Sequence, residues 1–229
     1  MCIRDRIKGY SIINFLEIFQ ITLSSISLAF ISSSFIMLLS LLMIIVGAYK
    51  SNNFQKILIF FASSGYAFPG TILAVGIVVF VGWLNDLIYF RMSYAVGGFI
   101  ILLFAYSIRF LAVGNGAITS GISRIHPNLL DASRTMGVSF FKSIRKIILP
   151  LLYTNLLVGG ILVFVDILKE LPITLLLRPF NFETLATYVY QYASDEMLEE
   201  SAFAALIIVI AGLGPVIFLN RTITKSIKN

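Results

Sequence analysis

The residues best suited to chemistry form a polar, glycine-ended stretch between long apolar runs. Asp131, Ala132 and Ser133 open this stretch, Arg134 adds a positive charge, and Gly137 closes it. The small side chains at 132 and 133 let another protein surface approach closely, and the charged groups can pair with ionised groups of a partner. The chemistry of this stretch is therefore recognition of a water-soluble partner.

A second candidate group contains the ionisable side chains Asp166, Lys169 and Glu170. Asp166 and Glu170 are four residues apart, so on a helix they share one face, with Lys169 beside them. Ionisable residues at the end of a membrane span are costly unless they face a cavity or pair with one another. This group has two alternative roles. It could be part of an outer gate on a substrate pathway, or it could be a mutual salt bridge whose lysine extends to the membrane interface.

The composition places both groups in a membrane protein. Hydrophobic residues make up 59% of the 229 residues, charged residues only 12%, and the mean hydropathy is +0.96, which is too apolar for a soluble domain. The formal charge of +6 is scattered among apolar runs, which is typical of loops anchored at the headgroups of a lipid bilayer and argues against nucleic-acid binding. Cys2 is the single cysteine, so we expect no disulfide within the chain and no thiolate metal cluster.

Membrane-spanning helices must position these residues. A spanning helix needs about 20 mostly apolar residues. The segments that qualify are 18–49, 57–84, 94–113, 147–167 and 202–219. We therefore predict an all-α fold, a polytopic membrane helix bundle of about five transmembrane helices.

The second predicted span should break near Pro69. This proline lies between Gly65 and Gly70, lacks a backbone donor and disfavours helix in the residue before it. We expect a short entry segment before Pro69 and a spanning helix after it. Irregular backbone at membrane depth survives only where protein or a water-filled cavity surrounds it, so Pro69 is also a candidate for the substrate pathway.

The loop charges orient the bundle, because short cytoplasmic loops collect Lys and Arg. Basic residues dominate the first and third connections and the tail 221–229, whereas acidic residues dominate the fourth connection. The C-terminus and the stretch around Gly137 are therefore expected on the cytoplasmic side.

The first residues do not follow this charge rule. With the C-terminus inside and five spans, Arg4, Arg6 and Lys8 would lie outside. We expect 1–17 to be a truncated or non-native segment and 18–220 to be a single transmembrane domain. The remaining residues would form the cytoplasmic tail.

Local signals predict a bent two-helix loop over residues 115–148. Pro127 suits the first turn of a helix, Gly137 suits the left-handed position that ends it, and Ser139 can cap the next helix. An alternative interpretation is an amphipathic hairpin that lies on lipid headgroups, which its Lys and Arg content would permit.

The same stretch resembles the EAA loop of ABC importer permeases of the binding-protein-dependent, MetI-like type. That pattern is Glu-Ala-Ala, three residues, Gly, nine residues, Ile, one residue and Leu-Pro. The corresponding positions here are Asp131, Ala132, Ser133, Gly137, Ile147, Leu149 and Pro150, with Asp131 in place of the Glu and Ser133 in place of the second Ala. The resemblance implies a cytoplasmic coupling loop that fits a groove in an ABC ATPase dimer and transmits its closure to the membrane helices.

The chain contains no Gly-rich Lys-Ser/Thr phosphate loop, so ATP with Mg is expected to be hydrolysed on a separate subunit. We therefore expect a non-enzymatic permease subunit that binds no cofactor and no metal. An intramembrane enzyme would need a nucleophile, metal dyad or acid pair at membrane depth, and the spans offer none. An ion-coupled secondary transporter would predict inverted repeats and ionisable residues at mid-span, which the sequence does not suggest.

The chain after about Gln20 looks like the second half of ferric-iron importer permeases. The similar runs are 65–70, 109–113, 165–180, 184–186 and 190–196. This resemblance implies import of ferric iron, delivered by an external binding protein, across a bacterial cytoplasmic membrane. It also implies a second permease half, either fused upstream or supplied as another chain. An importer of polyamine, thiamine, sulfate or a phosphonate is the alternative within the class.

Overall fold

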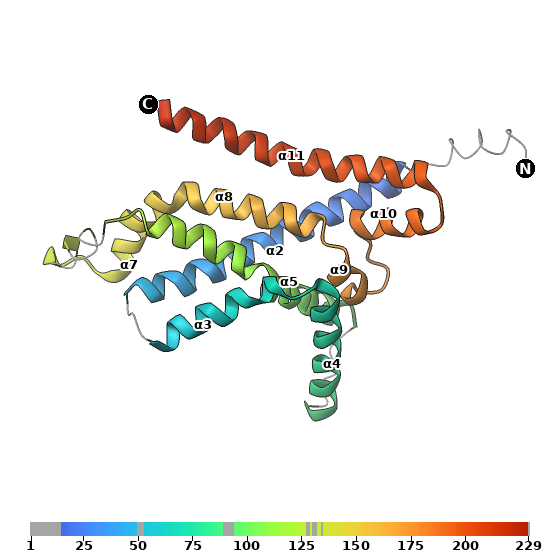
Figure 1. Ribbon diagram of the computed structural model, residues 1–229, viewed down its shortest axis with the longest axis horizontal. Coiled ribbons are helices and arrows are strands. Elements are labelled where there is room, and N and C mark those ends of the chain that lie inside the picture. Colours follow the sequence, from blue (N-terminus) through green and yellow to red (C-terminus); the bar gives the residue numbers. More distant parts are fainter. Residues whose placement is uncertain are drawn as a thin grey trace, which may run out of the picture.

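The computed structural model describes residues 15–49, 53–88, 94–126, 129, 132–133 and 135–228. Throughout these residues the regular structure is helical, which confirms the all-α prediction (Figure 1). The elements are α2 (Phe15–Tyr49), α3 (Asn53–Ser64), the 3-10 turn η1 (Gly65–Ala67), α4 (Gly70–Ile88), α5 (Tyr94–Ile122), α7 (Phe140–Ser143), the π-helical turn η2 (Ile144–Ile148), α8 (Leu149–Leu168), α9 (Pro172–Leu177), α10 (Leu185–Ser194) and α11 (Leu198–Lys228).

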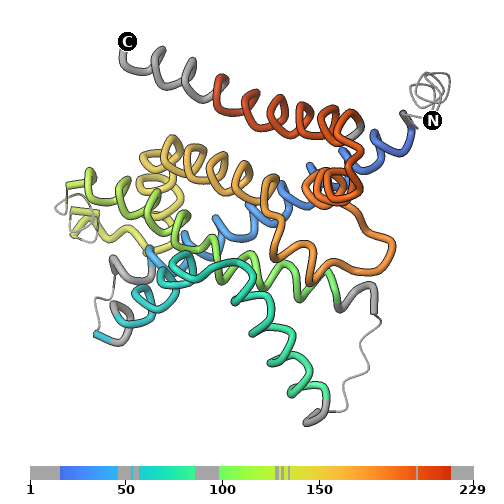
Figure 2. The backbone as a smooth tube through the Cα atoms, turned by 45° about the vertical axis from the view of Figure 1, so that its right-hand side comes forward, coloured from blue at the N-terminus to red at the C-terminus, as the bar shows by residue number. Residues whose placement is uncertain are grey.

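Helices α2, α5 and α8 pack against one another and form the centre of the bundle (Figures 1 and 2). Their shared core includes the fully buried Ile36, Leu102 and Leu152. Small residues let the helices approach closely: a Cβ added to Gly114 of α5 would lie 2.4 Å from Oγ of Ser40 on α2. Close contact through glycine and serine is the usual way in which membrane helices associate.

Within the described residues, three helical stretches are long and apolar enough to cross a membrane: Leu16–Ile45, Gly98–Ile122 and Phe140–Leu168. The pair Ile57–Ala67 and Gly70–Asn85 is a fourth if the two parts are one bent span, and Ser201–Ile217 is a shorter apolar helix. All five predicted positions are therefore helical, and three or four of them qualify as candidate spans.

Helix α5 ends at Ile122, further along the chain than the predicted boundary at 113. Its last turns contain Gly114, Asn115 and Gly116, residues of low helix propensity. They stay helical because packing overrides propensity: Asn115 is buried and donates to Oγ of Ser63 (3.4 Å). The connection between α5 and α7 consequently begins after Ile122 and not at residue 115.

The predicted break at Pro69 is present, and α3 and α4 meet there at 116°. Phe68 N donates to Gly65 O at 3.4 Å, and Leu73 N donates to Pro69 O at 3.1 Å as α4 begins. Helix α4 does not continue along the bundle as the expected spanning helix would. It turns away and packs on α9 and α5 (Figures 1 and 2).

Helices α10 and α11 cover the beginning of α2 (Figure 1). A second apolar cluster, which includes Ile21, Leu185 and Ala204, joins them. Ser25 Oγ of α2 accepts a hydrogen bond from Leu185 N (2.7 Å) at the start of α10. Thr184 caps α10, because its hydroxyl accepts from the backbone of Thr187 while Thr187 Oγ1 accepts from Thr184 N. These contacts fix the segment that connects α9 to α10.

Candidate functional site

The hairpin, defined here as the described residues from 132 to 148, turns at Gly137. Asp131, Arg134 and Pro127 lie outside the described residues. Gly137 has φ +73°, the left-handed conformation expected just past a helix end, and Val138 N donates to Ser133 O at 3.0 Å. This bond is the long hydrogen bond of a Schellman motif, so the sequence signal for a tight turn is correct.

Two serines join the arms of the hairpin. Ser143 Oγ donates to Ser133 Oγ at 3.0 Å, and both residues are buried. Ser133 therefore faces the inside of the hairpin. Its small size had suggested a surface open to a partner, but the side chain is buried. Ala132 is exposed, which leaves it accessible to a partner. Ser139 takes the cap position of α7, but its side chain makes no capping hydrogen bond.

The tip of the hairpin is apolar and exposed. The side chains of Met136 and Phe141 are 79% and 82% exposed, and Phe141 packs edge-to-face on Phe140 with ring centroids 5.4 Å apart. Lys142, Arg145 and Lys146 are exposed beside them. Met136 and Phe141 were not among the contact residues predicted from the sequence, although two large apolar residues in a polar loop are a signal for a contact surface.

The hairpin continues into α8 without a break, as α7, η2 and α8 follow one another directly. Pro150 is in the first turn of α8 and has no N–H to donate to residue 146. Leu149 N donates instead to Ile144 O, five residues back, which produces the π turn. Ile147 is half-buried and Ile148 is buried, so apolar contacts hold the turn on the bundle.

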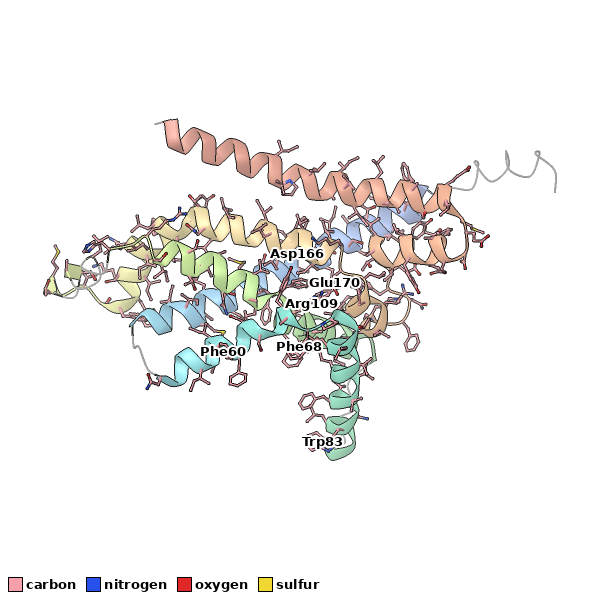
Figure 3. All side chains as sticks on the ribbon, viewed as in Figure 1. Phe60, Phe68, Trp83, Arg109, Asp166 and Glu170 are labelled. Carbon is pink, nitrogen blue, oxygen red and sulfur yellow. The ribbon has the colours of Figure 1, made fainter. Side chains whose placement is uncertain are left out.

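A cluster of charged side chains lies at the end of α8 furthest from the hairpin (Figure 3). We call this the outer cluster, and it consists of Arg109, Asp166, Lys169 and Glu170. Arg109 Nε lies 3.5 Å from Glu170 Oε2, and Lys169 Nζ lies 2.9 Å from Asp166 Oδ1. The cluster thus contains two ion pairs and no net formal charge.

The prediction that Asp166 and Glu170 share a helix face is wrong. Helix α8 ends at Leu168, and Glu170 lies in the turn that precedes α9. Pro172 opens α9, and a proline cannot continue the hydrogen bonding of a preceding helix. Glu170 therefore points to Arg109 of α5, while Asp166 forms its ion pair with Lys169.

Glu170 is the most buried member of the outer cluster, with 8% of its side chain exposed against 19% for Arg109. Burial raises the pKa of the Glu170 carboxyl, and the Arg109 guanidinium and the Ile173 backbone amide oppose this effect. The Lys169 side chain is 63% exposed. Its hydrogen bond to Asp166 raises the pKa of the amine.

The outer cluster touches the broken span. Arg109 Nη1 donates to Phe68 O at 3.4 Å, next to Pro69. A Cβ added to Gly70 would lie 2.5 Å from Arg109 Nη1 and 2.8 Å from Glu170 Oε1, so only glycine fits there without displacing the ion pair. In the sequence, Arg109 had stood out only as part of the similar run 109–113 and Gly70 only as a neighbour of Pro69, although an arginine inside an apolar span is a strong functional signal.

A groove of about 360 Å³ lies elsewhere, between α2, α8 and α11. Its lining is mostly apolar, with Phe30, Met37 and Phe164 among its residues and Ser33 and Ser34 as its polar members. None of the lining residues is ionisable. This groove suits apolar chains better than a charged cargo.

Comparisons with known proteins identify a family and a fold. The family described as "Binding-protein-dependent transport system inner membrane component" matches residues 40–229. The Fe(3+)-transport system permease protein FbpB 2 of Haemophilus influenzae is 25% identical over 157 residues, which are 68% of this chain and 29% of that protein. The match thus spans less than a third of the relative's length.

Three solved structures share the fold. A crystal structure of an amino acid ABC transporter with histidines aligns with TM-score 0.66 and 18% identity, covering 93% of this chain and 96% of that one. An inward-facing structure of the MetNI methionine ABC transporter gives TM-score 0.62 and 13% identity, with 89% and 95% covered. A bacterial ABC transporter involved in the import of the acidic polysaccharide alginate gives TM-score 0.61 and 17% identity, with 85% and 77% covered.

Proposed function

The chain belongs to the family of binding-protein-dependent transport system inner membrane components, and from this premise we propose that it is the permease of an ATP-driven importer of ferric iron. The cargo is supported by the Fe(3+)-transport permease of Haemophilus influenzae, at 25% identity. It is also supported by the resemblance of the segment 165–196 to ferric-iron permeases. Polyamine, thiamine, sulfate and phosphonate are the competing cargoes.

The observation that carries this function is the hairpin. Its exposed tip, Met136 and Phe141, combines apolar surface with the basic side chains Lys142, Arg145 and Lys146. An exposed apolar surface next to basic side chains is better suited to binding in a groove of a folded protein than to contact with lipid alone. The partner we propose is an ABC ATPase dimer, which would bind and hydrolyse ATP with Mg. Asp131, Ala132, Gly137, Ile147, Leu149 and Pro150 would shape and carry this contact.

Force applied to the hairpin would reach the far end of α8. The helical path from Phe140 to Leu168 is continuous, and α8 packs on both α2 and α5. When the ATPase dimer closes, a displacement of the hairpin would move α8 against the other two helices. Such small shifts of packed helices are a common form of conformational switching.

The outer cluster and Pro69 would then form the gate on the substrate pathway. Asp166 would supply a carboxylate, which suits a hard cation, and Lys169 would hold it between transport events, while Glu170 stays paired with Arg109. Among the described residues no group of three or more His, Cys, Asp and Glu side chains is placed to hold a metal ion. Weak, transient contacts are what a transport path needs, since it must release what it binds.

Three further components complete the proposal. An external binding protein would deliver the cargo to the outer cluster, and a second permease half would enclose the pathway. The setting would be a bacterial cytoplasmic membrane, with the hairpin and the C-terminus in the cytoplasm. The Lys and Arg content of the hairpin and tail supports this orientation.

A reconstitution experiment tests the function. The full chain, its second half, the ATPase and the binding protein are placed in proteoliposomes, and uptake of ferric citrate is compared with that of polyamine, thiamine, sulfate and phosphonate. ATP-dependent iron uptake supports the proposal. ATP-dependent uptake of another cargo would overturn iron while keeping the importer, and uptake driven by an ion gradient without ATP would overturn both.

A further inference from the structure

We propose that Arg109 is the positioning residue that transmits movement of α8 to the break at Pro69. It does so by holding the Glu170 carboxylate and the Phe68 carbonyl at the same time. This inference rests on the proposed function, because it assigns a role in the transport cycle. It concerns a residue that does not itself need to touch the cargo.

The geometry places Arg109 where three elements meet (Figure 3). Its own helix, α5, lies in the core of the bundle. Its Nε faces Glu170 Oε2 at 3.5 Å, just beyond the end of α8, and its Nη1 donates to Phe68 O at 3.4 Å, just before α4. The guanidinium fork can serve two acceptors in fixed directions, whereas a lysine ammonium is a single flexible point charge.

Gly70 leaves the space in which this contact forms. A side chain there would meet both partners of the ion pair, at 2.5 Å from Arg109 and 2.8 Å from Glu170. The backbone at the break is thus held against the ion pair itself. Any shift of Glu170 with α8 must move Arg109, the Phe68 carbonyl or both.

The charge balance favours a mechanical joint over a second binding site. The Asp166–Lys169 pair is separately satisfied at 2.9 Å, so the Arg109–Glu170 pair is neutral and has little attraction for another ion. Separating a largely buried pair leaves each charge uncompensated, which is costly. Glu170 and Arg109 are therefore expected to move together.

The break at Pro69 is a suitable hinge, at which a movement of α8 would change the angle between α3 and α4. Pro69 has no backbone N–H, and Phe68 N makes only a long contact to Gly65 O (3.4 Å). Few backbone hydrogen bonds thus resist a change of angle between α3 and α4. Hinges commonly consist of a few such residues at the ends of elements.

A distance measurement tests the joint. In a Cys2→Ser background, spin labels are attached at Val79→Cys on α4 and Leu162→Cys on α8, two exposed positions. Electron paramagnetic resonance then measures the distance across the break in lipid nanodiscs. The test variants are Arg109→Lys and Gly70→Ala, which disturb the joint by two independent routes. Arg178→Lys is the matched control, because Arg178 pairs with Glu183 (3.4 Å) and its other hydrogen bonds go to Phe182 and Thr187.

We expect a narrow distance distribution in the parent and in Arg178→Lys, and a broad one in Arg109→Lys and Gly70→Ala. In the assembled importer, the parental distance should shift on ATP binding, and the shift should be lost in Arg109→Lys. Uptake should fall by about tenfold, while the ATPase still copurifies and still hydrolyses ATP. A general loss of folding would instead lower copurification and hydrolysis together.

A distance distribution as narrow as the parent's in both Arg109→Lys and Gly70→Ala would overturn the inference. The comparison of widths needs only the chain in nanodiscs, so it remains decisive if no ATPase binds. Failure of the parent to bind an ATPase would count against the proposed function. The two failures are therefore distinguishable.

Discussion

Ser143 donates a hydrogen bond to Ser133 across the hairpin, and both side chains are buried. The contact joins the polar arm before Gly137 to the helix that leads into α8. A force applied at the tip would therefore be transmitted to both arms of the hairpin. Ser133 is therefore an internal contact of the hairpin.

Replacement of Ser143 by Ala should loosen the hairpin. Loss of one buried hydrogen bond costs about 1 kcal/mol, so hydrogen exchange at the amide of Val138 should become faster by about tenfold or less. Ser139→Ala is the control, because Ser139 makes no capping hydrogen bond. Equal protection of Val138 in the two variants would show that the serine pair does not hold the arms together.

The turn at Gly137 should tolerate asparagine far better than valine. With φ at +73°, a β-branched residue is strained by about 1–2 kcal/mol, whereas Asn is accepted in this region more readily. Gly137→Val should reduce copurification with the ATPase, and Gly137→Asn should retain most of it. If both variants bind the ATPase like the parent, the bend is not needed for docking.

Phe141→Asp should abolish ATPase binding while leaving the fold intact. Phe141 is 82% exposed and contributes little to the core, but it would be buried in the proposed groove. Phe180→Asp is the matched control, since Phe180 is 93% exposed in the turn after α9. A pull-down that recovers the ATPase equally with both variants would contradict docking through the tip.

Gly65→Ala should destabilise the bundle. A Cβ at this position would lie 2.0 Å from Ile108 O, and relief of such overlap typically costs about 1–3 kcal/mol. Gly82→Ala is the control, because nothing lies within 4 Å of its added Cβ. Thermal unfolding in detergent measures both, and an unchanged midpoint for Gly65→Ala would show that the η1–α5 contact adjusts freely.

Local chemistry made several features predictable from sequence. Pro69 between glycines signals a break because a proline removes a donor, and Gly137 signals a tight turn because it accepts positive φ. Runs of apolar residues of sufficient length indicate helices that cross a bilayer. Each of these signals acts over a few residues, so the tertiary structure does not easily override it.

The outer cluster was harder to predict, because its contacts join distant parts of the chain. The spacing of Asp166 and Glu170 suggested one helix face, but α8 ends between them and Glu170 turns to Arg109. The direction of α4 depends on packing against α9 and α5, which no local pattern encodes. The burial of Ser133 likewise depends on a partner across the hairpin.

The π turn at Ile144–Ile148 has a rotational consequence for the tip. Each residue added to a helix rotates the two flanking segments relative to each other by about 100°. The π turn before Pro150 therefore determines the direction in which Phe141 points around the axis of α8. Removing one residue from this turn would shorten the helix only slightly, but it would point the tip in a different direction around the axis of α8. The number of residues between Gly137 and Ile147 thus sets the direction in which the aromatic ring of Phe141 points.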